Sequence, residues 1–230
     1  MLKLENAVIA QGDFELRADL SILPGRKYAV IGPSGAGKST LLNAMAGFVA
    51  LRAGRLMWDD RDLTHSAPGA RPMTMLFQDN NLFGHLSVMQ NVGLGLRPDL
   101  RLTAPERERV GAALARVGLQ GKAQSKPGTL SGGQQSRVAL ARVLVQAEPL
   151  LLLDEPFAAL GPALRNEMLD LVQELVGETN AALVMVTHAP QDVRRIADDV
   201  IFVEGGRAHA PRPAAALMDD PPPELRAYLG

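Results

Sequence analysis

The residues best suited to chemistry have the spacing G-x-x-x-x-G-K-[ST] and form the stretch Gly32-Pro33-Ser34-Gly35-Ala36-Gly37-Lys38-Ser39-Thr40. Glycines allow backbone N–H groups to surround phosphate oxygens, and a helix that starts beside them presents the positive end of its dipole. Lys38 adds a cation for the β- and γ-phosphates, and the Ser39 hydroxyl suits Mg²⁺. A simple glycine-rich turn is the alternative. The strand expected before this stretch and the helix expected after it favour a phosphate-binding loop, in which all nine residues contact a nucleotide.

A second chemical feature is the acidic pair Asp154-Glu155, which follows the apolar run Leu150 to Leu153. Parallel sheets place their ligands at the carboxyl ends of strands, so both carboxylates are expected at that edge. Asp154 suits the Mg²⁺ shell, and Glu155 suits polarisation of an attacking water. An acidic pair after a strand is more often a solvated turn, and only the phosphate-binding loop upstream makes the catalytic interpretation the expected one.

The elements that must position these residues alternate between strands and helices. Alternating or continuous apolar residues predict strands at 14–22, 27–31, 73–77, 150–153, 182–186 and 200–203. Helical patterns are predicted after the phosphate-binding loop as far as Gly47, from about 87 to 119, at 135–146, and from Pro162 onward. Thr103 with Glu106 predicts a capping box, and Ser131 with Gln134 predicts a second one before the helix at 135–146. This order predicts an α/β fold with a mostly parallel sheet, interrupted by a helical lobe between Gln78 and Ser131.

Composition limits the classes of protein that the chain can represent. Its 230 residues are near the upper limit for one hydrophobic core, and 47% hydrophobic with 21% charged residues is ordinary for a globular protein. The net charge of −1 gives no basic field toward nucleic acid, and the absence of cysteine excludes disulfides and cysteine-ligated metals. No run approaches the roughly 20 apolar residues that span a bilayer, and no signal peptide is expected.

A third motif identifies a family. Leu130-Ser131-Gly132-Gly133-Gln134, followed by Gln135-Ser136-Arg137, resembles the signature sequence of ATP-binding-cassette ATPases. A serine and two glycines at a helix start can also be a simple N-cap, which is the commoner situation. However, the phosphate-binding loop, Gln78 after a strand, this motif, Asp154-Glu155 and Thr187-His188 occur in the order found in that family. The resemblance extends over roughly residues 1–210.

The resemblance implies a P-loop NTPase core with a mostly parallel sheet, an antiparallel β subdomain and an inserted helical subdomain. One nucleotide-binding domain is expected over residues 1–230, with the helical subdomain at approximately 79–148 and a peripheral tail at 211–230. ATP and Mg²⁺ are the implied cofactors. Two copies are expected to dimerise head to tail, so that each ATP lies between the phosphate-binding loop of one copy and the signature motif of the other.

The family also implies a role for individual residues. Ser131, Gly132, Gly133 and Gln134 are expected to bind ATP held by the partner copy. Glu155 is expected to be the catalytic base, or at least to orient the water. The γ-phosphate is the expected contact of His188, although a lone histidine is more often a packed or surface residue. Mg²⁺ is expected to lie among Ser39, Gln78 and Asp154, with Gln78 also reporting nucleotide state to a transport partner.

Two stretches around the predicted strand at 73–77 indicate a particular group within this family. Arg71-Pro72-Met73-Thr74-Met75-Leu76-Phe77-Gln78-Asp79-Asn80-Asn81-Leu82-Phe83, with the later Gln90-Asn91-Val92-Gly93-Leu94-Gly95-Leu96, is similar to ATPases of bacterial thiamine importers. This similarity implies uptake of thiamine or its phosphates through an integral-membrane permease, with a periplasmic substrate-binding protein as an indirect partner. The expected location is peripheral, on the cytoplasmic side of the bacterial inner membrane. Nucleic acid is not an expected partner.

Two positions depart from the family pattern. Gln11 stands about where an aromatic residue usually lies near the adenine, and Phe14, which is close by, is expected to be a core residue of its strand. Gly161 stands where an aspartate usually ends the loop after the acidic pair. The first departure predicts nucleotide affinity weakened by about five- to a hundredfold, since base stacking is worth roughly 1–3 kcal/mol. The second puts communication between two ATP sites in doubt.

Other functions remain as alternatives. An importer ATPase for another small solute has the same motifs, although importers of inorganic anions or metal chelates often append a regulatory domain that is not expected here. DNA-maintenance ATPases share the signature but insert a long coiled coil, and no sustained heptads occur between Gln78 and Ser131. Translation-factor ATPases normally have two cassettes in one chain, and one set of motifs is present here.

Overall fold

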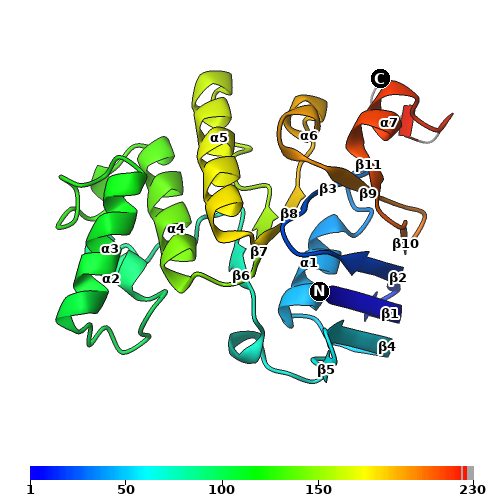
Figure 1. Ribbon diagram of the computed structural model, residues 1–230, viewed down its shortest axis with the longest axis horizontal. Helices are drawn as coiled ribbons and strands as arrows, with labels where there is room; N and C mark the ends of the chain where they lie inside the picture. The colour runs from blue at the N-terminus through cyan, green and yellow to red at the C-terminus, as the bar shows by residue number, and fades with distance from the viewer. Residues whose placement is uncertain (224, 227–230) are drawn as a thin grey trace.

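A computed structural model describes residues 1–223 and 225–226. Five parallel strands form the middle of the described fold (Figure 1). In pairing order they are β9 (Asp199–Glu204), β3 (Lys27–Ile31), β8 (Ala182–Val186), β7 (Leu150–Asp154) and β6 (Thr74–Leu76). Nearly all of their residues are buried, as expected where helices cover both faces of a sheet. The predicted parallel sheet is confirmed, with each of these strands within one residue of its expected bounds.

A group of antiparallel strands extends the same sheet at one end. In chain order it contains β1 (Leu2–Gln11), β2 (Phe14–Ile22), β4 (Leu51–Trp58) and β5 (Arg61–Asp62). The short strand β10 (Arg207–Ala208) joins the two parts, because it pairs with β2 on one side and with β9 on the other. Strand β2 confirms the alternating pattern of the sequence, whereas β1 and β4 were not predicted.

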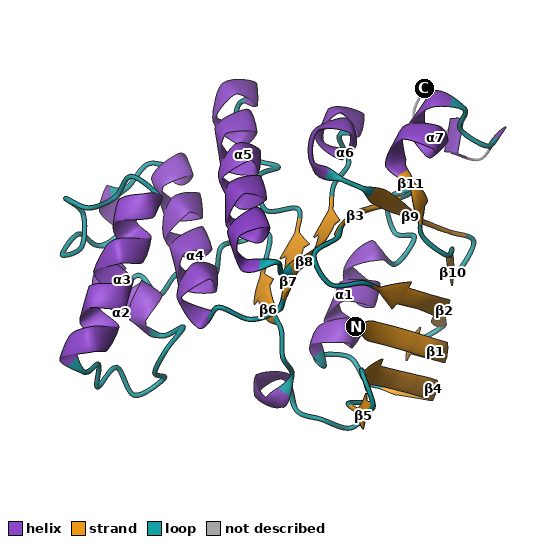
Figure 2. Cartoon of the chain, viewed as in Figure 1, coloured by secondary structure: helices purple, strands orange, loops and turns teal. Residues whose placement is uncertain are grey.

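Helices cover the two faces of the parallel strands (Figure 2). Helix α1 (Lys38–Ala46) lies between the parallel and the antiparallel strands, while α5 (Pro162–Thr179) and α6 (Pro190–Ile196) cover the opposite face. Alternate residues of β7 contact each side, so that Leu152 joins the cluster around α1 and Leu153 joins the cluster around α5.

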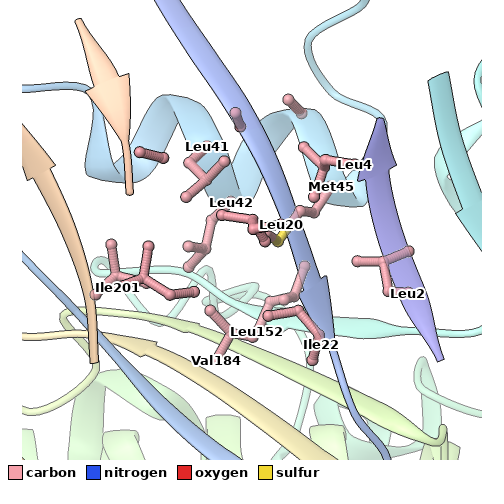
Figure 3. Packing of buried hydrophobic residues seen from close by; sticks show 14 of the residues in the cluster. Leu2, Leu4, Leu20, Ile22, Leu41, Leu42, Met45, Leu152, Val184 and Ile201 are labelled. Atoms are coloured by element: carbon pink, nitrogen blue, oxygen red, sulfur yellow. The ribbon is translucent and has the colours of Figure 1, made fainter. Parts of the chain in front are cut away.

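The largest buried cluster surrounds α1 and fixes the helix that follows the phosphate-binding loop. Figure 3 shows Leu41, Leu42 and Met45 of α1 packed between the two parts of the sheet, among the strand residues Leu2, Leu4, Leu20, Ile22, Leu152, Val184 and Ile201. Burial of a leucine-sized side chain contributes about 1.5–3 kcal/mol, so this packing holds the start of α1 firmly against β3 and β7. Gly47 ends the helix with φ +90°, as the sequence predicted.

A separate group of helices lies beside β6 (Figure 1). It contains α2 (Val88–Gly93), α3 (Ala104–Arg116), the 3₁₀ turn η2 (Pro127–Thr129) and α4 (Gly132–Gln146). Its helices pack around their own apolar cluster, which agrees with the expected helical lobe. A further 3₁₀ turn, η1 (Pro68–Ala70), precedes β6.

Two helix predictions in this region need correction. The pattern from 87 to 119 contains two helices, because α2 ends at Gly93 and α3 begins only at Ala104, after the Thr103 cap. Helix α4 begins at Gly132 and not at Gln135, since Ser131 is the N-cap residue. Both expected capping boxes are confirmed.

The segment after 210, which was expected to be a peripheral tail, lies at one end of the molecule but is not loosely attached in its described part. Strand β11 (Arg212–Pro213) pairs with β9, and α7 (Ala214–Asp219) follows it. Leu217 and Met218 of this helix are buried in one cluster with residues of β3 and β9. The described part of the segment therefore completes the apolar covering of the sheet.

Candidate nucleotide-binding site

The phosphate-binding loop connects β3 to α1 in a conformation that its glycines permit. Gly37 is the N-cap of α1 and has φ +102°, and a Cβ atom there would lie 2.6 Å from the Phe14 ring. At Gly32 a Cβ atom would lie 2.0 Å from the carbonyl oxygen of Val203. Larger residues at either position would displace the loop, because such distances are far below van der Waals contact. The loop therefore brings backbone N–H groups close to a helix N-terminus, which is a favourable arrangement for an anion.

Lys38 lies within this loop. Its Nζ atom donates hydrogen bonds to the carbonyl oxygens of Gly32 and Pro33, both at 2.8 Å, and the residue is 5% exposed. Burial lowers the pKa of the Lys38 ammonium, and the nearby charges of Glu155 and Asp154 oppose that effect. Both bonds involve the loop's own backbone. The charge is thus held at the place where the sequence predicts terminal phosphates, on a side chain long enough to turn toward a ligand.

Ser39 and Asp154 meet across the site although 115 positions separate them in the sequence. The Ser39 hydroxyl donates a hydrogen bond of 2.9 Å to Asp154 Oδ1, at the carboxyl end of β7. Burial raises the pKa of the Asp154 carboxyl and the neighbouring Glu155 adds to the rise, while the bond from Ser39 and the charge of Lys38 oppose it. A hydroxyl and a carboxylate at hydrogen-bonding distance are the kind of oxygen donors that Mg²⁺ binds.

Gln78 lies at the same edge of the sheet. Leu76 of β6 pairs with Leu153 of β7 in parallel register, so Gln78 follows β6 at the level where Glu155 follows β7. Its side chain is exposed. The register thus places the backbone of Gln78 beside that of Glu155, although Gln78 is not among the residues that line the pocket at Lys38.

Glu155 and His188 face each other at the carboxyl ends of β7 and β8. Glu155 Oε1 lies 2.6 Å from His188 Nε2, and the Glu155 N–H donates to the carbonyl oxygen of Val186 at 3.2 Å. The backbone of Glu155 has φ +47°, a conformation that costs a non-glycine residue about 1 kcal/mol or more. The surrounding strands therefore hold this carboxylate in a strained but defined position.

These residues surround one open pocket of about 380 Å³. Its lining comes from the phosphate-binding loop, the segments after β7 and β8, the end of β1 and the start of β2, namely Gln11, Phe14, Ser34, Gly35, Gly37, Lys38, Ser39, Thr40, Glu155 and His188. Most of the predicted residues of one copy are thus brought together, whereas Gly32, Pro33, Ala36, Gln78 and Asp154 do not line the pocket. The pocket has room for phosphates beside a cation, and a carboxylate and an imidazole also line it.

Gln11, which departs from the family pattern, and the nearby Phe14 also line this pocket. Phe14 is half-buried and packs against the core, as expected, but its ring also touches the loop at Gly37. Gln11 is exposed, and its Oε1 accepts a hydrogen bond of 3.2 Å from the Thr40 hydroxyl. The Gln11 side chain thus contacts the first turn of α1, a contact that the sequence did not indicate.

The signature residues lie elsewhere. Ser131 caps α4, because its hydroxyl accepts from the N–H of Gln134 while the Gln134 side chain accepts from the N–H of Ser131. Ser131 and Gly132 are exposed, and none of residues 131–134 lines the pocket at Lys38. Helices α4 and α1 stand apart in Figure 1, with β6 and β7 between them. One copy of the chain therefore does not bring its own signature residues to its own phosphate-binding loop.

Two contacts beside the site were not predicted. Arg142 of α4 donates to the carbonyl oxygens of Asn80 and Asn81, at 2.7 and 2.8 Å, and so ties the segment after Gln78 to the signature helix. Behind His188, Thr187 donates to Asp192. The sequence signal for the second contact was present but weak, since Asp192 is an acid in the first turn of a helix that begins at Pro190.

Every helix in the described part of the chain is too short or too polar to cross a membrane.

Comparisons with known proteins agree with this arrangement. The family described as ABC transporter matches residues 16–158. The thiamine import ATP-binding protein ThiQ of Cereibacter sphaeroides is 60% identical over 230 residues, and that of Ruegeria sp. (strain TM1040) is 58% identical, with all of both chains covered in each case. The dimeric post-hydrolysis state of the ATP-binding cassette MJ0796, bound to ADP and Pi, has a TM-score of 0.81 at 29% identity and covers 93% of this chain and 99% of that one.

Proposed function

Because this chain belongs to the ABC transporter family, we propose that it is the ATP-hydrolysing subunit of an importer whose cargo is thiamine or its phosphates. The single observation that supports ATP hydrolysis most strongly is the pocket in which Lys38, Ser39, Glu155 and His188 meet. Support for the cargo comes from full-length identities of 60% and 58% to two thiamine import ATP-binding proteins.

In this proposal the phosphate-binding loop, residues 32–40, holds ATP. Lys38 leaves the backbone carbonyls of Gly32 and Pro33 and turns to the β- and γ-phosphates, which are stronger acceptors because they are charged. Ser39, Asp154 and Gln78 would supply oxygen ligands for Mg²⁺, whose charge would offset that of the phosphates. The bond between Ser39 and Asp154 keeps two of these donors in place before a metal binds.

Glu155 orients the attacking water and accepts its proton, and His188 contacts the γ-phosphate. Their separation of 2.6 Å supports this division of roles, because the imidazole restrains the carboxylate that must face the water. Strain at Glu155 is also typical of residues whose position matters for catalysis.

The remaining donors come from a second copy. Ser131 and Gly132 are exposed at the start of α4, where backbone N–H groups favour an anion, whereas Gly133 is buried and Gln134 is partly buried. None of the four lines the pocket of its own chain. A head-to-tail homodimer supplies them in trans and encloses the ATP. The partners of this dimer are an integral-membrane permease and, through it, a periplasmic substrate-binding protein. Its location is the cytoplasmic face of the bacterial inner membrane.

The catalytic part of the proposal is tested with Glu155→Gln. This variant should bind ATP as tightly as the parent chain and lose at least about 10²-fold in turnover, since a positioned general base contributes 10²–10⁴-fold. The measurements are phosphate release and the affinity for a fluorescent ATP analogue. Lys38→Ala is the control that should lose tight binding. Normal turnover by Glu155→Gln would remove Glu155 from its assigned role.

The cargo is tested by uptake of labelled thiamine in cells that lack this chain. Uptake should return with the wild-type chain and not with Glu155→Gln, while import of an unrelated solute stays constant in both. Unchanged thiamine uptake in cells without the chain, or recovery of a different solute instead, would contradict the assignment of cargo and leave ATP hydrolysis untouched.

A further inference from the structure

A buried polar cluster lies directly behind the turn that contains His188. Thr187 and Asp192 are each 3% exposed, and the Thr187 hydroxyl donates a hydrogen bond of 2.6 Å to Asp192 Oδ2. The same hydroxyl accepts a bond of 3.1 Å from the N–H of Ala189. Its oxygen is therefore bonded on both sides, and it fixes the backbone immediately before and after His188.

The turn is also anchored to the sheet and to α5. The Thr187 N–H donates to the carbonyl oxygen of Val30 in β3 at 3.3 Å. Arg165 of α5 lies with its Nε atom 3.5 Å from Asp192 Oδ2. The carboxylate of Asp192 thus connects three elements, since it lies on α6, pairs with α5 and holds the hydroxyl at the end of β8.

This cluster is expensive to bury. Asp192 Oδ1 and Arg165 Nε are buried without a hydrogen-bond partner, and an unsatisfied buried polar atom costs about 1–3 kcal/mol. Both residues line a cavity of about 200 Å³ that Glu155 and His188 line as well. An apolar packing of the same volume would be cheaper, so stability alone does not account for the cluster.

We propose that Asp192 is a positioning residue of the site, which acts through the Thr187 hydroxyl to hold His188 against Glu155. The inference rests on the proposed role of His188. Because the imidazole is connected to the backbone by two rotatable bonds, its place at 2.6 Å from Glu155 depends on the turn that Thr187 and Asp192 fix. Arg165 keeps the Asp192 carboxylate in place from α5.

Thr187 offers a matched pair of variants. Thr187→Val keeps the shape of the side chain and removes the hydroxyl, while Thr187→Ser keeps the hydroxyl. We expect Thr187→Val to lower kcat for ATP by about 10–100-fold, because a displacement near 1 Å at a reacting centre can cost 10²-fold. The KM for ATP and the affinity for a fluorescent ATP analogue should change less than about threefold, because the phosphate-binding loop is untouched. Thr187→Ser should retain kcat within about threefold.

Asp192→Ala, combined with His188→Ala, separates positioning from stability. Asp192→Ala removes the acceptor of the Thr187 hydroxyl and should lower kcat like Thr187→Val. In the His188→Ala background it should lower kcat no further, because residues that act as a unit are not additive. Melting temperatures of all variants are measured beside kcat. A purely structural role would lower the melting temperature of Thr187→Val and Thr187→Ser together and leave kcat of the folded protein unchanged.

The outcomes distinguish this inference from the proposed function. If His188→Ala loses turnover while folded Thr187→Val keeps it, the inference is overturned and the proposed function stands. Full additivity of Asp192→Ala with His188→Ala overturns it as well. If Glu155→Gln and His188→Ala both hydrolyse ATP normally, the proposed function itself fails. Should Asp192→Ala not fold, the Thr187 pair alone decides.

Discussion

At the scale of the residue, the site combines opposite charges that are both shielded from water. Lys38 is 5% exposed and Asp154 is 9% exposed. Burial shifts the pKa of each group toward its neutral form, downward for the ammonium and upward for the carboxyl. Neither residue is present for stability, since a buried charge without a full set of partners destabilises the fold. Each is instead prepared for a charged ligand, which would replace the lost water.

Asp154→Asn should therefore stabilise the protein while it abolishes Mg²⁺-dependent turnover. The amide is isosteric, can still accept from Ser39, and leaves Lys38 with the charge of Glu155, which affects it more than Asp154 does. A gain of about 1 kcal/mol is expected at neutral pH. Ser39→Ala is the control, because it removes the hydroxyl and keeps the charge, and should not stabilise.

The pH dependence of that gain has a definite sign. The folded state holds a proton on Asp154 more tightly than the unfolded state, whose pKa is near the ordinary value of 3.8. The contribution of the Asp154 carboxyl to the free energy of unfolding is lost as the pH rises from 3.8 through the raised pKa of the folded state. Above that pKa the contribution no longer changes with pH. The difference between Asp154→Asn and the wild type should thus be largest at neutral pH and shrink as the solution is acidified. Urea unfolding across that range measures it, and a gain that grows in acid would contradict the argument.

Residues contiguous in a motif could be predicted from the sequence, and residues that meet only in the fold could not. Gly32 to Ser39 and Asp154-Glu155 each have a type and a spacing that chemistry demands. The bond between Thr187 and Asp192 has no such spacing, because it depends on a turn closed at Ala189. The alternation of apolar residues in the strand at 14–22 predicted the contact of Phe14 with the core. It did not predict the contact of the Phe14 ring with Gly37.

At the scale of the element, all three α-helices of the helical lobe begin with a capping box, and the box at Ser87 before α2 is buried. Thr103 before α3 and Ser131 before α4 both form complete capping boxes, with Glu106 and Gln134 as their partners. Both caps are exposed. Locally the two helix starts are therefore equivalent, and a difference in function between them must come from what lies opposite Ser131 in an assembly.

This equivalence makes Thr103→Ala a matched control for Ser131→Ala. Each change should lower the free energy of unfolding by about 1 kcal/mol, because it removes one N-cap hydrogen bond. Only Ser131→Ala should also weaken ATP turnover, if the signature motif binds the partner's γ-phosphate. Chemical unfolding and steady-state ATPase assays measure the two effects. Equal loss of turnover in both variants would assign the Ser131 effect to helix stability alone.

Two strands were missed for identifiable physical reasons. In β1 the buried residues are Leu2 and Leu4, then Ala7 and Ile9, because a bulge at Asn6, with φ +47°, shifts the register. One extra residue changes the inward face from even to odd positions, which destroys the period of two that identifies a strand. Strand β4 is mostly exposed on both faces, so it had no alternation to detect.

At the scale of the whole molecule, the topology brings the residues at the ends of the parallel strands together and leaves the signature motif apart from them. The carboxyl ends of β3, β6, β7 and β8 lie at one edge, so the phosphate-binding loop, Glu155 and His188 meet there although they are far apart in sequence, and Gln78 follows β6 at the same edge. The signature motif is in the helical lobe, on a different part of the surface. The order of motifs in the sequence did not reveal this separation, which only the family resemblance suggested.

The last prediction concerns the open side of the pocket at Lys38, which none of residues 131–134 of the same chain lines. Triphosphate bound at Lys38 would expose oxygens of its γ-phosphate, and the exposed Ser131 helix start is a suitable surface for anions. We expect Glu155→Gln, which cannot remove the γ-phosphate, to form a stable dimer with Mg–ATP and to remain monomeric with Mg–ADP. Analytical ultracentrifugation measures the change in mass.

The control for this dimer adds charge to the proposed contact. Ser131→Glu in the Glu155→Gln background keeps an acceptor at the helix cap but places a carboxylate against the γ-phosphate, so like charges should prevent ATP-dependent association. Thr103→Glu makes the same change at the equivalent cap and should leave the dimer intact. If both double variants dimerise equally, the ATP is not enclosed by the Ser131 region, and the head-to-tail arrangement must be abandoned even if the chain hydrolyses ATP.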